Sequence, residues 1–258
     1  MTPPVTLERQ GSLAVVTIDA PPLNLFDRAM FDALRATVDE LTEDPSRGVL
    51  IRAQGRTVSG GVDVHEFEGL SAQQGAALWN DHIPIFQAVE DLPVPTVFAA
   101  HALCLTAAFE LALACDLLLA AESARFGLVE IVVGLTPSLG GVQRLAERAG
   151  PARARELVYT GELFDAATLE HWNVVNRVLP DDGFADAALT FAARLADGPT
   201  RAHAATKALV REQLRAGARA ADAIVAEVSG PLFETDDLRG AVQSFLTEGP
   251  GRARYEGH

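Results

Sequence analysis

Residues 99–141 read AAHALCLTAAFELALACDLLLAAESARFGLVEIVVGLTPSLGG. This run combines a turn of small residues, the start of a helix, a buried strand and two glutamates among apolar neighbours, Glu110 and Glu130. A charged carboxylate is costly to bury, so it reaches solvent, pairs with a cation or serves a site that uses its raised pKa. For either glutamate alone, a place on the polar edge of its element explains the pattern equally well. Because the two bracket one helix–strand unit, we predict a pair that works together.

The helix predicted at residues 107–114 bears on the same site. Thr106 is a suitable N-cap, and Ala107 and Ala108 suit a first helical turn. The first N–H groups of a helix have no intrahelical partner and lie at the positive end of its dipole. We therefore expect the Ala107 N–H to be able to donate to a carbonyl oxygen that becomes an oxyanion. Glu110 is expected one turn away, facing the same cavity.

Composition excludes several classes of protein. The formal net charge of −14, without a cluster of Lys and Arg, argues against nucleic-acid binding. Cys104 and Cys115 have apolar neighbours and are interpreted as packed thiols, so no disulfide and no metal site is predicted. No apolar run reaches the roughly 18–20 residues of a membrane span, and the N-terminus lacks a signal-peptide pattern. We expect a cytoplasmic protein that does not enter the membrane.

The remaining pattern predicts an α/β protein with a helical end. Two strands turning at residues 10–12, a helix at 27–41 with Asp27 as its cap, and a strand at 48–53 predict a parallel strand pair with a crossover helix. After Pro180 the β-rich pattern becomes almost entirely helical. We therefore divide the chain into residues 1–180 and residues 181–258.

The loop after the strand at 48–53 carries Gly60 and Gly61. Ligands of open α/β folds collect at the carboxyl ends of strands, and glycine lets the backbone approach a ligand closely. A lone pair of glycines is nevertheless more typical of an ordinary loop than of a binding site. No GxGxxG or GxxxxGK[ST] run is present here, which argues against a nucleotide-binding loop.

Several stretches together resemble the enoyl-CoA hydratase/isomerase (crotonase) superfamily. They are SGGVDV, EDLPVPTVFAA, FELALACDLLLAAESARFGLVEIVVGLTPSLGGVQRL, ELVYTGELFDAATL, VVNRVLP and the helical C-terminal third. The resemblance implies a crotonase (ClpP-like) spiral of ββα units in residues 1–180, which would bind an acyl-CoA thioester and carry out catalysis. It also implies that the helices of residues 181–258 serve trimerisation, giving a homotrimer or a dimer of trimers.

The resemblance also assigns site residues. The two catalytic glutamates of the hydratases match Glu110 and Glu130, and the two backbone N–H donors of the oxyanion hole match Val62 and Ala107. No metal and no separate cofactor are implied, since CoA is part of the substrate. The positions implied to contact CoA or the substrate are Leu23, Asn24, Gly60, Gly61, Val64 and His65.

This chain departs from the family pattern near the oxyanion hole. Thr106, Ala107 and Ala108 stand where three glycines are usual, and Val62 replaces a small alanine. Because the donors are backbone groups, we expect the oxyanion hole to survive and the pocket to be narrower.

Other polar and aromatic residues have simpler interpretations. Trp79 and Trp172 are interpreted as packing residues and Arg144 as a structural ion partner. Local cations must offset the acidic chain if CoA phosphates bind; the candidates are Arg28, Lys207, Arg252 and Arg254.

The sequence thus predicts an enoyl-CoA hydratase of fatty acid metabolism, which adds water reversibly and syn to a trans-2-enoyl-CoA. Glu110 and Glu130 would hold the water and divide the acid and base roles. Two alternatives stay open. One is a Δ3-to-Δ2 enoyl-CoA isomerase, which can use a single glutamate, and the other is a noncatalytic acyl-CoA-binding protein on the same fold.

Overall fold

The computed structural model of the protein describes residues 3–258. Its main sheet has six strands in the order β1-β2-β3-β4-β6-β9, with β1 antiparallel to β2 and every later pair parallel. The helix α1 (Arg28–Glu43) connects β2 to β3, which confirms the predicted strand–helix–strand unit. The strands are β1 (Val5–Gln10), β2 (Leu13–Ile18), β3 (Gly48–Ala53), β4 (Thr96–Ala100), β6 (Leu117–Ala121) and β9 (Arg177–Leu179).

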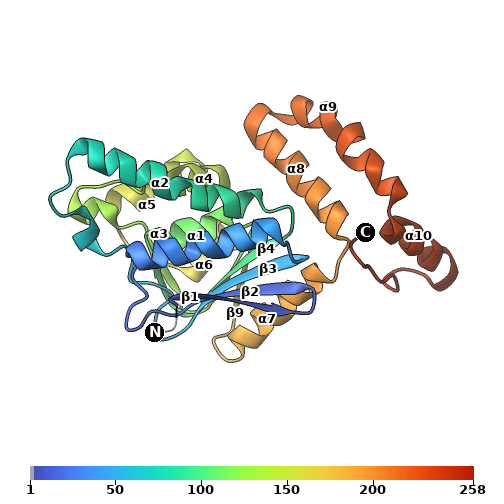
Figure 1. The fold of residues 1–258 in the computed structure, drawn as a ribbon, viewed down its shortest axis with the longest axis horizontal. Coiled ribbons are helices and arrows are strands. Elements are labelled where there is room, and N and C mark those ends of the chain that lie inside the picture. Colours follow the sequence, from blue (N-terminus) through green and yellow to red (C-terminus); the bar gives the residue numbers. More distant parts are fainter. Residues whose placement is uncertain (1–2) are drawn as a thin grey trace.

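Helices cover both faces of the main sheet (Figure 1). Ala14 and Val16 of β2 pack into the larger core with α1, α2 (Ala72–Asp91) and α3 (Ala107–Ala114). Leu13 and Val15 face the opposite side and pack against α7 (Phe184–Ala196). Side chains alternate between the two faces because a strand repeats every two residues, and a parallel sheet needs cover on both faces.

Local signals explain where the first helices begin. The carboxylate of Asp27 accepts a hydrogen bond from the Met30 N–H, which confirms Asp27 as the cap of α1. The sequence predicts a helix over residues 78–92, whereas α2 begins earlier, at Ala72, because Ser71 and Gln74 form a capping box in a polar stretch.

A smaller sheet holds the segments that carry the predicted site. Its strands are β5 (Leu103–Leu105), β7 (Arg125–Gly127) and β8 (Phe164–Asp165). The Leu103 carbonyl accepts from the Val58 and Ser59 N–H groups, and the Gly127 carbonyl accepts from the Thr106 N–H. The loop after β3, the start of α3 and the segment after β7 are therefore fixed to one another. The 3₁₀ turn η1 (Val64–Phe67) ends the first of these segments, and the Asp63 carboxylate caps it by accepting a hydrogen bond from the His65 N–H.

The segment around Glu130 contains a strand end and a turn. The sequence predicts a strand or a turn at residues 126–130, and β7 includes Phe126 and Gly127 while Glu130 begins the 3₁₀ turn η2 (Glu130–Val133). The helices that follow are α4 (Gly141–Ala149), α5 (Pro151–Thr160) and α6 (Ala166–His171).

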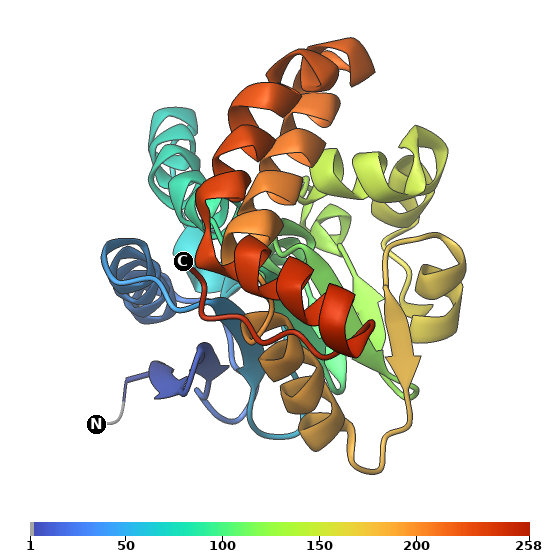
Figure 2. The same cartoon turned by 90° about the vertical axis from the view of Figure 1, so that its right-hand side faces the viewer.

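The C-terminal helices extend away from the sheet (Figures 1 and 2). They are α8 (Thr200–Ala216), α9 (Ala218–Ser229), the 3₁₀ turn η3 (Gly230–Glu234) and α10 (Asp236–Glu248), so the predicted helical end is confirmed. Helix α7 also lies beyond residue 180 but packs on the sheet. The division at residue 180 stays a prediction. Within residues 3–258, no helix combines the length and apolar character needed to cross a bilayer.

Candidate active site

A pocket of about 190 Å³ lies where the loop after β3, the start of α3 and the turn η2 meet. Its wall includes both predicted glutamates, Glu110 and Glu130. Other predicted site residues in the wall are Gly60, Val62 and Val64. The remaining predicted site residues lie outside the wall; they are Leu23, Asn24, Gly61, His65 and Ala107.

Glu110 projects from the first turn of α3 and is only 2% exposed. Its Oε2 accepts hydrogen bonds from the Leu139 N–H at 2.9 Å and from the Gly141 N–H at 2.7 Å. Burial raises the pKa of Glu110 to about 7, although the two N–H donors and the Arg144 guanidinium act to lower it. Glu110 therefore has partners that stabilise its ionised form inside an apolar surrounding.

The turn before α4 is built to bring these amides to Glu110. Gly141 lies so close that a Cβ there would be 2.6 Å from the Glu110 Cγ, and Gly140 has a φ of +98° and borders Arg144. Arg144 donates to the Leu139 carbonyl at 3.2 Å and pairs with Glu90. Its predicted role as a structural ion partner is confirmed.

Glu130 is half-buried at the start of η2, and its Oε2 has no hydrogen-bond partner among residues 3–258. Burial, and after it the negative charge of Glu110, raise the pKa of Glu130 to about 8. The two carboxyls therefore titrate as a coupled pair around neutral pH, and Glu130 keeps its proton to a higher pH than Glu110. An acid and a base in one pocket can move protons to and from the same bound molecule.

Thr106 occupies the N-cap position of α3 as predicted, but its side chain does not cap the helix. Its side chain makes no capping hydrogen bond, and its φ of +47° with ψ of −120° lies outside the extended backbone usual for an N-cap. The Thr106 Oγ1 instead accepts a hydrogen bond from the Val62 N–H at 3.0 Å. The Val62 N–H therefore donates to a side chain of the protein in this structure, and its role as a donor to a substrate oxygen stays a prediction.

Ala107 is completely buried as the first residue of α3. Among residues 3–258, no acceptor forms a hydrogen bond with its N–H. The side chain of Thr106, which directly precedes it, lines the pocket.

The positions expected to contact CoA mostly shape the loops beside the pocket. The Asn24 amide donates to the Gln54, Thr57 and Val58 carbonyls, and its Oδ1 accepts from the Ala20 N–H. Leu23, which precedes Asn24, is held as well: its carbonyl accepts a hydrogen bond from the Gly60 N–H at 2.8 Å.

Next to this loop, Gly61 has a φ of +106° and approaches Thr106 so closely that a Cβ would lie 2.6 Å from Oγ1. His65 is mostly exposed, with its Nδ1 2.7 Å from Asp63 Oδ1. CoA contacts at these positions stay predictions.

The rest of the pocket wall is apolar. Trp79, interpreted from sequence as a packing residue, packs on Phe67 with ring centroids 5.6 Å apart and also faces the pocket. No local sequence pattern indicated that Trp79 lines a pocket while Trp172 does not. Trp172 packs on Phe164, as expected of a packing residue. The other apolar wall residues are Val129, Val132, Val133, Leu135 and Leu139.

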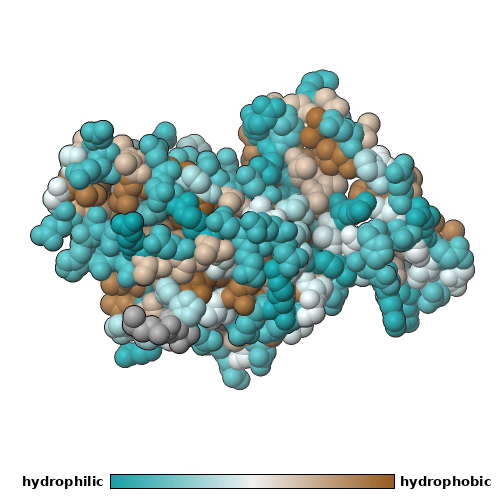
Figure 3. Space-filling view, in the orientation of Figure 1, coloured by the Kyte–Doolittle hydropathy of each residue, from teal (hydrophilic) through white to brown (hydrophobic). Residues whose placement is uncertain are grey.

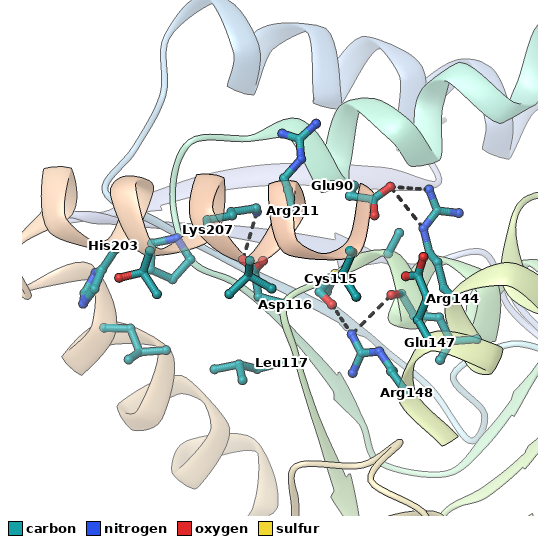
Figure 4. Close-up of a pocket in the computed structure, with 17 residues that line it drawn as sticks. Glu90, Cys115, Asp116, Leu117, Arg144, Glu147, Arg148, His203, Lys207 and Arg211 are labelled. Atoms are coloured by element: carbon teal, nitrogen blue, oxygen red, sulfur yellow. Dashed lines mark hydrogen bonds and ion pairs between the residues drawn. The ribbon is translucent and has the colours of Figure 1, made fainter. Parts of the chain in front are cut away.

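A second cavity of about 490 Å³ lies between α8 and the ends of α3 and α4 (Figure 4). It is rich in cations, and each of them has a carboxylate or carbonyl partner. Lys207, a candidate for CoA phosphates, is 2.9 Å from Asp116 Oδ2. The other pairs are Arg144 with Glu90, Arg211 with Asp91, and Arg148 with the Leu113 and Cys115 carbonyls. No group of three or more residues among those described is arranged to hold a metal ion.

Comparison with known proteins supports one family. A family model described as enoyl-CoA hydratase/isomerase matches residues 8–252. A probable enoyl-CoA hydratase of Mycobacterium tuberculosis is 35% identical over 201 residues, 78% of this chain and 77% of that protein. A probable enoyl-CoA hydratase of Bacillus subtilis is 29% identical over 245 residues, 94% of this chain and 95% of that protein.

Solved structures give the same result for the fold. An enoyl-CoA hydratase subunit from Geobacillus kaustophilus superposes with a TM-score of 0.91 at 26% identity, covering 99% of this chain and 98% of that chain. The predicted crotonase fold is therefore confirmed. With its family model spanning almost its whole length, this chain belongs to the enoyl-CoA hydratase/isomerase family.

Proposed function

We propose that the protein is an enoyl-CoA hydratase that adds water reversibly to a trans-2-enoyl-CoA thioester. The observation that carries the proposal is the pair Glu110 and Glu130, two carboxyls with raised pKa values in the wall of one apolar pocket. Adding water across a conjugated double bond needs one group to take a proton and another to give one, and such a pair can do both. Membership of the family supports an acyl-CoA thioester as the substrate.

The hydrogen bonds around the two carboxyls suggest how they divide the work. Two backbone N–H groups stabilise ionised Glu110, which makes it the base that takes a proton from water as the oxygen attacks C3. Glu130, which has the higher pKa and an Oε2 without a hydrogen-bond partner among the described residues, is the acid that gives its proton to C2. Between these steps the electron pair of the double bond shifts onto the thioester oxygen, where donors must stabilise the charge. A proton passing from Glu110 to Glu130 resets the pair.

The proposal is tested by following the loss of enoyl-thioester absorbance with crotonyl-CoA and with a longer-chain enoyl-CoA. Glu110→Gln and Glu130→Gln should each lower kcat by about 10²–10⁴-fold, because each removes a positioned acid or base. Glu122→Gln, at an exposed glutamate following β6, is the matched control and should leave kcat unchanged. Full turnover in both pocket variants would show that the assigned mechanism is wrong.

One observation favours the alternative of a noncatalytic acyl-CoA-binding protein: Thr106 occupies the Val62 N–H. Under that alternative, acyl-CoA would bind measurably in calorimetry while no enoyl-CoA is turned over. A Δ3-enoyl-CoA added to the same assay series tests the isomerase alternative, which needs only one of the two carboxyls.

A further inference from the structure

Thr106 adopts a backbone conformation that threonine normally avoids. Its φ of +47° with ψ of −120° belongs to a region favoured by glycine, and a β-branched side chain there is an outlier. Such strain persists only where the surrounding structure enforces it, and it concentrates at functional sites. The position of Thr106, in the pocket wall with Glu110 and Glu130, gives reason to look for a role of its side chain.

The surrounding structure forms a closely fitted seat for the Thr106 hydroxyl. Gly61 leaves room for it: a Cβ on Gly61 would lie 2.6 Å from Oγ1. The Val62 N–H donates to Oγ1 at 3.0 Å, and the Thr106 side chain is only 7% exposed. Phe26 and Ser59 in turn hold this turn in place through the Gly61 carbonyl and N–H. The hydroxyl is thus held in one place by contacts that the rest of the loop maintains.

The hydroxyl retains one capability that these contacts do not use. A threonine hydroxyl carries one donor proton as well as its acceptor lone pairs. Its oxygen accepts from Val62, but among residues 3–258 no acceptor takes its proton. An N–H donating to a hydroxyl oxygen polarises the O–H bond and makes it a stronger donor. The proton is therefore available to an acceptor that enters the pocket.

We propose that the Thr106 hydroxyl is itself an oxyanion donor, which bonds the thioester oxygen together with the Ala107 N–H while the Val62 N–H acts through it. The inference rests on the proposed function and assigns its oxyanion site to a side chain in place of one backbone amide. Thr106 and Ala107 are consecutive at the start of α3, so both donors belong to one rigid element. Preorganised donors of this kind stabilise the charge that develops on the oxygen during the reaction.

Three substitutions separate the hydroxyl from the shape of the side chain. Thr106→Val keeps the β-branched shape and removes the hydroxyl, so we expect kcat to fall by about 10²–10³-fold, as for loss of one oxyanion donor. Thr106→Ser keeps the hydroxyl and should stay within about tenfold of the unchanged protein. Thr106→Gly exposes the Val62 N–H and should recover part of the activity that Thr106→Val loses. Thermal unfolding of each variant verifies that it is folded.

The opposite role, a hydroxyl that blocks the oxyanion hole, predicts a different order. Thr106→Gly and Thr106→Val would then be more active than the unchanged protein, which would overturn the inference. Equal activity of Thr106→Val and the unchanged protein, or an equal loss in Thr106→Ser and Thr106→Val, would overturn it as well.

A second readout does not depend on turnover. The infrared band of the thioester carbonyl in bound ¹³C-labelled butyryl-CoA shifts to lower frequency when donors polarise it. We expect this shift in the unchanged protein and in Thr106→Ser, and a smaller shift in Thr106→Val. A hydroxyl-dependent shift without any hydration would refute the proposed function and support the donor role. If the protein hydrates enoyl-CoA but the band shift is the same with and without the hydroxyl, the proposed function is supported and the donor role is refuted. Failure of butyryl-CoA to bind would refute both.

Discussion

Glu110 and Glu130 both have apolar neighbours, but their carboxyl groups differ in their hydrogen bonds. Glu110 receives two backbone N–H donors, whereas the Oε2 of Glu130 receives none from the described residues. Burial raises both pKa values, and the charge of Glu110 adds to the shift of Glu130. The difference in hydrogen bonding is what makes a division into base and acid possible, since two identical carboxyls would have no preferred roles.

The raised pKa of Glu110 predicts how stability depends on pH. Its ordinary value is 4.5 and its value in the folded protein is about 7, so the folded state holds a proton that the unfolded state has already lost. The contribution of this group to the free energy of unfolding is therefore unaffected below about pH 4.5, decreases as pH rises from about 4.5 to about 7, and levels off above that. Glu110→Gln removes the penalty, so relative to the unchanged protein it should gain on the order of 3 kcal/mol between pH 5 and pH 8.

The measurement is urea unfolding of both proteins at the two pH values. Glu122→Gln, which alters an exposed glutamate, is the control and should show no such pH-dependent gain. If Glu110→Gln gains no stability relative to the unchanged protein on going to pH 8, Glu110 does not carry a raised pKa.

At the scale of single residues, the sequence predicted which residues share a site better than it predicted which residues contact each other. Two glutamates in apolar runs were enough to predict that they share a site, and both line one pocket. The contact between Thr106 and Val62 was beyond prediction, because it joins residues 44 positions apart and depends on a positive φ at a threonine. Local propensity assigns threonine to a cap, and the tertiary structure overrides that preference.

At the scale of elements, the turn between η2 and α4 matters most for the site. Gly140 and Gly141 let this turn approach Glu110 and Arg144 without a side chain in the way. The two glycines can be seen in the sequence, but the sequence alone does not show why they are needed. The reason is that the side chains of Arg144 and Glu110 pack against them in the folded protein. The start of α2 was predicted six residues too late, at residue 78 instead of Ala72, because its polar first turns carry no apolar periodicity.

Replacing Gly141 by alanine tests this close packing. A Cβ at Gly141 would lie 2.6 Å from the Glu110 Cγ and 2.8 Å from its Oε2, so Glu110 must move. We expect Gly141→Ala to lower the free energy of unfolding by about 1–3 kcal/mol, as overpacking does, and to reduce hydration sharply. Thermal unfolding and the crotonyl-CoA assay measure the two effects.

Gly75→Ala is the matched control for that substitution. Gly75 lies inside α2, and a Cβ there would meet nothing within 4 Å. Alanine should therefore stabilise the helix by roughly 0.5–1 kcal/mol and leave activity unchanged. Equal stability and activity of the two alanine variants would contradict the packing of Gly141 on Glu110.

At the scale of the whole molecule, the C-terminal helices leave apolar side chains in solvent. Figure 3 shows apolar surface on this part of the protein, which stands apart from the sheet. Large exposed apolar patches on a globular protein mark surfaces that bind another molecule. The exposed residues are Val210 and Leu214 of α8, Val225 of α9, Phe233 of η3, and Val242, Phe245 and Leu246 of α10.

We expect this surface to hold a homotrimer or a dimer of trimers together, as the sequence resemblance implies. Phe245 is 61% exposed in the single chain, and burying a phenylalanine contributes about 1.5–3 kcal/mol. Phe245→Glu should therefore raise the concentration at which the assembly dissociates by at least about tenfold, while Gln243→Glu adds the same charge to α10 without removing apolar area. Analytical ultracentrifugation over a concentration series measures both. A stable monomer in the unchanged protein, or equal dissociation in the two variants, would show that α10 does not form the interface.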